Sequence, residues 1–131
     1  MNPFKTEEEK VTYVETLTAL VSIGENINES HKILIYNILR NYDLPETYAD
    51  RVWKKVRSKV KLEEIMMPIK AMDMDVRLLL VQELIMMHLA SGTYQQAKDK
   101  LINVCRELEV PVKLEALKEH VQNVLKSNNK L

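Results

Sequence analysis

Apolar positions recur along the chain at intervals of three and four residues, which is the spacing of amphipathic helices. The first such segment follows Thr6 and Glu9, a pair with the form of a helix-opening capping box. Asn28 is expected to cap the second, and Pro45 to stand in the first turn of the third. We expect a helix that begins near Leu62 to be interrupted or bent at Pro68. The expected helices cover about residues 7–22, 29–42, 45–56, 62–68, 76–90, 93–109 and 112–126.

The segment 76–90 is the most apolar of these helices. Eleven of its fifteen residues are apolar, so they cover most of its circumference. A helix of that kind is buried on most sides. The pattern therefore predicts that 76–90 is the central helix of the fold.

A helical pattern occurs twice in the chain, at 34–45 and, sixty-six positions later, at 100–111. Each copy stops at an apolar residue followed by proline. The repeat indicates pseudo-duplication over about 10–60 and 76–126, in which each half gives the other an apolar face to bury. No linker rich in Gly, Ser or Pro divides the chain. We therefore predict one compact all-α domain over 1–131 with about seven helices around 76–90.

Composition agrees with a helical globular protein. The 131 residues include only two glycines and four prolines, too few for the many turns of an all-β chain. Lys and Arg balance Asp and Glu at nineteen each, so global charge favours no nucleic-acid partner. No stretch of about 18 uncharged apolar residues predicts a membrane span. The first ten residues lack the apolar run of a signal peptide, so a cytoplasmic location is expected.

Candidate catalytic groups are scattered. His31, His88 and His120 fall on different predicted helices without a second ligand at helical spacing. We expect His31 and His120 to be solvated and His88 to be a hydrogen-bonded core residue. Cys105, the single cysteine, lies mid-helix without a base to activate it. No catalytic motif occurs, so we expect a non-enzymatic protein without a cofactor. The alternative is an enzymatic or ligand-binding site assembled from dispersed residues, such as His88 with Glu83.

Oxygen-bearing side chains gather between the first two predicted helices. Glu25, Asn26, Asn28 and Glu29 are of the type that holds Ca²⁺ or Mg²⁺. The spacing of an EF-hand is absent. Asn28 and Glu29 also suit a helix N-terminus, and capping is the favoured interpretation.

A basic run lies at 51–61, with six positive charges and no acid. It could bind an anionic surface, including peripheral contact with a membrane, through Lys54, Lys55, Arg57 and Lys59. The favoured alternative is a solvated face. In that case the apolar residues turn inward, and these are Val52, Trp53, Val56 and Val60.

Six of the seven methionines fall within twenty-two residues. Methionine fills irregular core gaps, and it also lines adaptable partner-binding grooves. Core filling is favoured, but Met66, Met67, Met72 and Met74 near the Pro68 irregularity are candidates for contact with a protein partner.

The plan of two halves resembles that of the TerB-like (tellurite-resistance) family over about 10–125. In that family each half has Ala-Asp-Gly, a short polar stretch and then a glutamate that opens the next helix. Here 89–94 reads Leu-Ala-Ser-Gly-Thr-Tyr, with Ser91 at the aspartate position and Lys98 near the glutamate. The first half, 22–27, reads Ser-Ile-Gly-Glu-Asn-Ile, with His31 near the glutamate position.

The resemblance implies a small bacterial cytoplasmic helical module associated with stress response. Such a module would act by binding other proteins, near the inner membrane surface. Three of the family's four acidic loop residues are neutral or basic here, which implies that the metal site of the family is degenerate in this chain.

Overall fold

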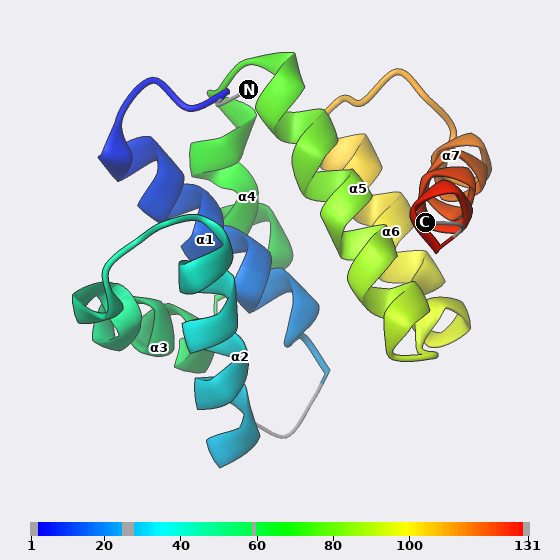
Figure 1. Ribbon diagram of the computed structural model, residues 1–131. Coiled ribbons are helices and arrows are strands. Elements are labelled where there is room, and N and C mark those ends of the chain that lie inside the picture. The colour runs from blue at the N-terminus through cyan, green and yellow to red at the C-terminus, as the bar shows by residue number, and fades with distance from the viewer. Residues whose placement is uncertain (1–2, 25–27, 59, 130–131) are drawn as a thin grey trace. The chain divides into compact units, whose positions relative to one another are not determined.

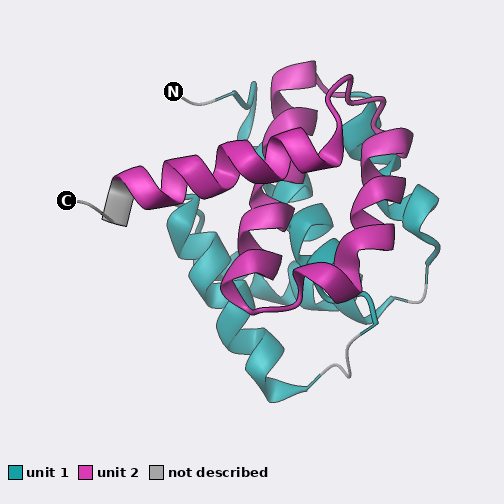
Figure 2. Cartoon of the chain, turned by 90° about the vertical axis from the view of Figure 1, so that its right-hand side faces the viewer, with its two compact units in different colours: residues 1–71 teal, residues 72–131 magenta. Residues whose placement is uncertain are grey.

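The computed structural model describes residues 3–24, 28–58 and 60–129 (Figure 1). Within those ranges the chain forms seven α-helices and one short 3-10 helix and no strand, which confirms the predicted all-α class. The chain divides into two compact units, Met1–Ala71 and Met72–Leu131, coloured separately in Figure 2. The single domain over 1–131 stays a prediction.

The first unit is built around its first helix. Its elements are α1 (Glu7–Val21), α2 (Glu29–Asn41), the 3-10 helix η1 (Glu46–Tyr48), α3 (Ala49–Arg57) and α4 (Leu62–Lys70). Helix α1 packs against α2, α3 and α4. It is therefore the central helix of this unit.

Polar residues are part of the buried surface of α1. Thr16 and Thr18 are fully buried, and their hydroxyls donate to the Thr12 and Val14 carbonyls at 2.9 and 2.7 Å. Because the helix's own carbonyls accept these bonds, the two threonines can be buried without the usual desolvation penalty. The apolar residues of this segment form one stripe along the helix, which predicts burial on one side only. The apolar pattern therefore did not identify α1 as a central helix.

The N-terminal segment is held by an aromatic cluster. The ring of Phe4 lies 5.0 Å from that of Tyr13 and 6.0 Å from that of Tyr42, and the two tyrosine rings are 5.4 Å apart. Thr6 caps α1 by accepting a bond from the Glu9 backbone N–H at 3.0 Å, as predicted. These contacts fix the start of α1 against the end of α2.

The second unit consists of α5 (Met74–Ala90), α6 (Tyr94–Glu107) and α7 (Leu114–Asn129). Helix α5 packs against both α6 and α7, so the predicted central helix is central within this unit. Its fully buried positions include Leu80, Val81, Leu84 and Ile85. The Arg77 guanidinium donates to the Leu108 carbonyl at 2.8 Å, which ties α5 to the end of α6.

The order and packing of α5, α6 and α7 repeat those of α1, α2 and α3, sixty-six positions earlier. The ends of α2 and α6 are also equivalent. Asp43 and Glu109 both have φ of +54°, and Leu44 and Val110 donate to carbonyls five residues back at 2.9 and 3.0 Å. This is the Schellman ending, usually made with glycine.

Three predicted helix boundaries need correction. Pro45 precedes η1 and does not stand in the first turn of α3, which begins at Ala49. Helix α4 continues through Pro68 to Lys70, so of the two alternatives predicted at Pro68, an interruption or a bend, the interruption is wrong. Proline has no backbone N–H, so the Glu64 carbonyl lacks its usual helical donor at position 68. Glu64 and Pro68 are both exposed, so water can donate to that carbonyl instead. Helix α7 continues to Asn129, beyond the predicted end.

Candidate functional site

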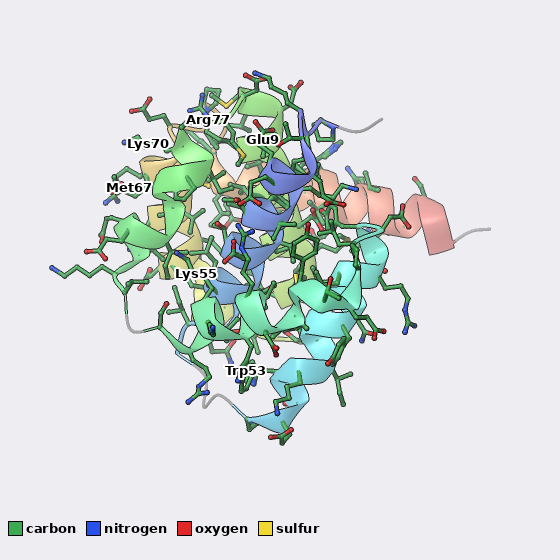
Figure 3. The ribbon with its side chains drawn as sticks, turned by 90° about the vertical axis from the view of Figure 1, so that its left-hand side faces the viewer. Glu9, Trp53, Lys55, Met67, Lys70 and Arg77 are labelled. Carbon is green, nitrogen blue, oxygen red and sulfur yellow. The ribbon has the colours of Figure 1, made fainter. Side chains whose placement is uncertain are left out.

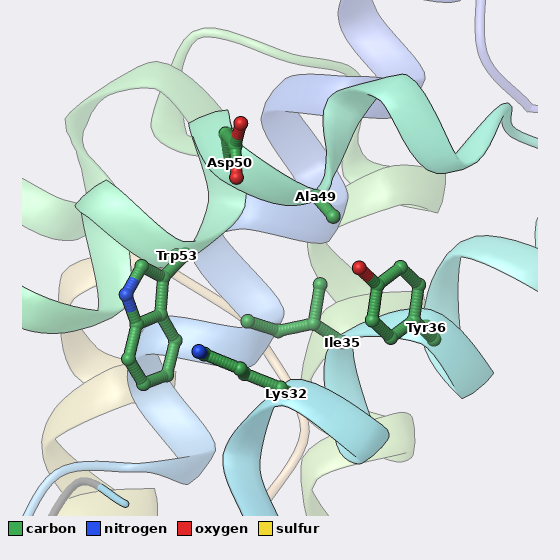
Figure 4. A pocket seen from close by; sticks show the side chains of 6 residues that line it. All are labelled: Lys32, Ile35, Tyr36, Ala49, Asp50 and Trp53. Carbon is green, nitrogen blue, oxygen red and sulfur yellow. The ribbon is translucent and has the colours of Figure 1, made fainter. Parts of the chain in front are cut away.

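An open groove lies between α2 and α3 of the first unit (Figure 4). It has a volume of about 270 Å³, and we call it the Trp53 groove. Its lining residues are Lys32, Ile35, Tyr36, Ala49, Asp50 and Trp53. Ile35 is buried, whereas Tyr36 is 41% exposed and its neighbour Ile33 is 64% exposed. The groove is thus open to solvent and combines aromatic, aliphatic and charged side chains.

Two cations flank the indole ring of Trp53. Lys32 Nζ lies 5.3 Å from the ring centroid and the Arg57 guanidinium lies 5.7 Å from it, both within cation–π range. Lys32 also pairs with Glu29 of its own helix at 3.2 Å. Trp53 was expected to turn inward, but it is only half-buried. The apolar period places a side chain on a face, and it does not show how far a large ring extends from that face.

The equivalent surface of the second unit carries an ion pair between α6 and α7. Lys98 of α6 lies 3.3 Å from the Glu115 carboxylate of α7, and the Tyr94 hydroxyl donates to the same carboxylate at 3.4 Å. In the repeat, Lys98 corresponds to Lys32 and Glu115 corresponds to Ala49. An alanine therefore stands where a bridging acid would be, and the groove of the first unit is open.

Helix α3 is fixed against α1 by a charged network. Arg51 donates through both terminal nitrogens to Glu8 and through Nε to Glu15 at 2.9 Å, and the Tyr48 hydroxyl donates to Glu7 at 2.7 Å. The bond from Arg51 lowers the pKa of Glu8, and the bond to Glu7 raises the pKa of Tyr48. Bonds to the two carboxylates likewise raise the pKa of Arg51. Arg51 thus connects two helices and is not part of a wholly solvated basic face.

The start of α2 is a capping box. The Asn28 side chain accepts from the Ser30 N–H at 2.9 Å, and the Asn28 N–H donates to His31 Nδ1 at 3.2 Å. The predicted capping role of Asn28 is confirmed. The prediction that His31 is solvated is wrong, because the ring is buried in closing this box.

The two predicted cation ligands that lie within the described residues make other contacts. Asn28 caps α2 and Glu29 pairs with Lys32, whereas Glu25 and Asn26 lie outside the described residues. Within the described ranges, no three His, Cys, Asp or Glu side chains come together in a way that could hold a metal ion.

A second pocket, of about 300 Å³, lies where α1, α3 and α4 meet. Its apolar walls include the buried Ala19, Val56 and Ile65, and Lys55 and Arg57 line it as well. Of the predicted anionic-surface candidates, Lys54 and Arg57 are exposed and Lys55 is half-buried, while Lys59 lies outside the described residues. Val60 was expected to turn inward and is 38% exposed, because α3 ends at Arg57 and the helical period no longer applies.

The methionine candidates do not form one surface within a unit. Met66 is buried in the core of the first unit and cannot contact a partner, which corrects its candidacy. Met67, on the same helix, is 67% exposed and projects outward (Figure 3). Met72 and Met74 are half-buried and belong to the second unit.

The dispersed catalytic candidates of the second unit lie on α5, α6 and α7. His88 is buried, as predicted, with Nδ1 2.8 Å from the Thr93 hydroxyl. Glu83 instead lines a pocket of about 170 Å³ between α5 and α7, together with the exposed His120. Burial raises the pKa of the Cys105 thiol, which makes it less reactive.

None of the helices in the described ranges combines the length and the hydropathy that a membrane span requires. Comparison of the chain with protein-family models, with curated proteins and with solved structures found no match. The resemblance to the TerB-like family therefore stays a prediction.

Proposed function

We propose that this chain is a non-enzymatic protein-interaction module of the TerB-like type, and that its partner docks in the Trp53 groove. The stress-response role and the degenerate metal site that the resemblance implies belong to the same proposal. The observation that carries the docking site is the contrast between the two halves of the repeat. Lys98 and Glu115 form an ion pair between α6 and α7, whereas the α2–α3 groove is open and has Ala49 at the position equivalent to Glu115.

The side chains at the groove are suited to a protein interface. Trp and Tyr are enriched among the residues that dominate binding energy at interfaces, because they bury a large area at a small entropic cost. Here Trp53, Tyr36 and the buried Ile35 line the groove, and the exposed Ile33 precedes Tyr36 by three residues on α2. The three pockets described above, about 170, 270 and 300 Å³, lie at or below the usual size of small-molecule sites, ~300–1,000 Å³.

The charges at the groove define the partner's chemistry. Lys32 and Arg57 flank the indole ring, so a partner segment that places an apolar side chain in the groove would meet them with carboxylates beside that side chain. Asp50 lines the wall that α3 contributes and would accept a donor from the same segment. The expected partner is therefore an amphipathic segment with an apolar anchor and flanking acids.

Site-specific photo-crosslinking in the source cell tests the docking site. A crosslinking residue at Tyr36 or Ile33 should capture the same protein, and one at the exposed Val124 of α7 should not capture it. The purified partner should then change the fluorescence of Trp53, the single tryptophan of the chain. Ala49→Glu should weaken this binding by about tenfold or more, because it introduces an acid equivalent to Glu115 into the groove and keeps Lys32, Tyr36 and Trp53 unchanged. Ala49→Ser is the matched control and should bind normally.

Several outcomes would contradict the proposal. One is a partner that binds Ala49→Glu as tightly as it binds the natural chain, which would place its site elsewhere. Another is equal capture from Tyr36 and Val124, which would show that crosslinking reports exposure alone. Capture of no protein at either groove position under several growth conditions would also count against an interaction module.

A further inference from the structure

The pocket between α1, α3 and α4 opens on a surface with two kinds of side chain. Ile23, after α1, and Val60, before α4, are 40% and 38% exposed, so two aliphatic groups stand at one end of the first unit. Lys55 and Arg57 line the same pocket, and Lys61 follows Val60. We call these five residues the basic end. Figure 3 marks Lys55 on α3.

The cations of the basic end are available to an anionic ligand. Among the described residues, Lys55, Arg57 and Lys61 make no ion pair with a carboxylate, in contrast to Arg51 of the same run. Glu63 and Glu64 lie in the first turn of α4, and they too form no ion pair among the described residues. Because no carboxylate among the described residues pairs with them, these three cations can attract an external anion.

We infer that the basic end docks on the surface of a membrane that contains anionic phospholipids. The three cations would contact the phosphates of the lipid headgroups. Ile23 and Val60 would insert beside them, at the boundary between the headgroups and the acyl chains. Such a combination of aliphatic side chains and unpaired cations is the chemistry of interfacial membrane contact. The ligand differs from the proposed partner of the Trp53 groove, and the two sites share only Arg57, which lies between them.

The aliphatic side chains favour a membrane over a nucleic acid. A nucleic acid would use the three cations but would gain nothing from Ile23 and Val60, and no aromatic ring lines this pocket for a base to stack on. A lipid interface uses both features. The same argument explains why two exposed aliphatic residues accompany the cations at one end of the unit.

Vesicle flotation with the full chain tests the inference. The probes are vesicles of phosphatidylcholine alone and of phosphatidylcholine with about a quarter phosphatidylglycerol. We expect binding only to the anionic vesicles at about 0.05 M salt, and much weaker binding at ~0.3 M, because salt screens exposed charges. Lys55→Gln and Lys61→Gln should each weaken binding about fivefold. The matched control is Lys126→Gln on α7, which should leave binding unchanged.

The aliphatic residues provide the measurement that separates a membrane from other polyanions. Val60→Ser should weaken vesicle binding by roughly fivefold and leave the circular dichroism spectrum unchanged, since Val60 lies outside the helices. Equal binding to neutral and anionic vesicles would overturn the inference. So would a Val60→Ser variant that binds vesicles normally, or a chain that binds single-stranded DNA and no vesicle at the same salt.

Discussion

The equivalent endings of α2 and α6 lead to a prediction about stability. Glycine should be more stabilising than alanine at these helix ends, and less stabilising than alanine within a helix. Asp43 and Glu109 adopt φ of +54°, a conformation that costs an L-residue roughly 1–2 kcal/mol. Glycine avoids that penalty but gains freedom in the unfolded chain, which offsets about 0.5–1 kcal/mol. At either position a glycine variant should therefore be more stable than an alanine variant by about 0.5–1 kcal/mol.

The comparison of glycine with alanine isolates the backbone from the side chain. Replacing Glu109 removes a carboxylate whatever the new residue is, and this loss cancels between Glu109→Gly and Glu109→Ala. Asn37 is the control position, because it is exposed and lies within α2. There alanine should be the more stable variant, by about 1 kcal/mol.

Urea unfolding measures each free energy, with a different probe for each unit. Trp53 fluorescence follows the first unit and so reports the Asp43 and Asn37 variants. The second unit has no tryptophan, so the Glu109 variants are followed by far-ultraviolet circular dichroism, to which the helices of both units contribute. Equal or greater stability for alanine at 43 and 109 would refute the left-handed backbone assigned to both helix ends.

Three further predictions concern single side chains. His31→Ala should destabilise the first unit by about 1–2 kcal/mol in urea unfolding followed by Trp53 fluorescence, and His31→Gln should lose less because glutamine can also close a capping box. Cys105 should react with iodoacetamide more slowly than a free cysteine at any pH near 8, since burial raises its pKa, and unfolding in urea should abolish the difference. Burial, with Glu115 adding to it, raises the pKa of Tyr94 to about 12, above its ordinary value near 10. The contribution of Tyr94 to stability is therefore complete below about pH 10 and should be lost as the pH rises through about 12. Over that pH range, the Tyr94→Phe variant should lose less stability than the natural chain.

The features that could be predicted are those set by local spacing. The apolar period located the helices, and the capping roles of Thr6 and Asn28 followed from their place before an acidic or apolar run. The repeated apolar-proline pairs located the ends of α2 and α6. Each of these depends on residues within one or two helical turns of one another, which a sequence displays directly.

The features that could not be predicted depend on contacts between distant segments or on the end of a regular period. Arg51 appeared to belong to a solvated basic face, because its partners Glu8 and Glu15 lie about forty positions earlier. Val60 appeared to turn inward, because the period of α3 was extended past Arg57. The Trp53 groove is defined by side chains from two helices, so no single stretch of sequence indicates it.

The duplication itself accounts for where function is expected in this fold. Both halves keep the buried positions and the left-handed helix ends, which selection for packing alone would preserve. They differ at the surface between the second and third helices, where one half has Lys98 with Glu115 and the other has Lys32 with Ala49. An ion pair of exposed side chains contributes little to stability, so its absence costs the first unit little, and the half-buried Trp53 stays accessible to a ligand there. The proposed binding surface thus lies where the two copies differ, and Ala49 is the position at which that difference can be tested.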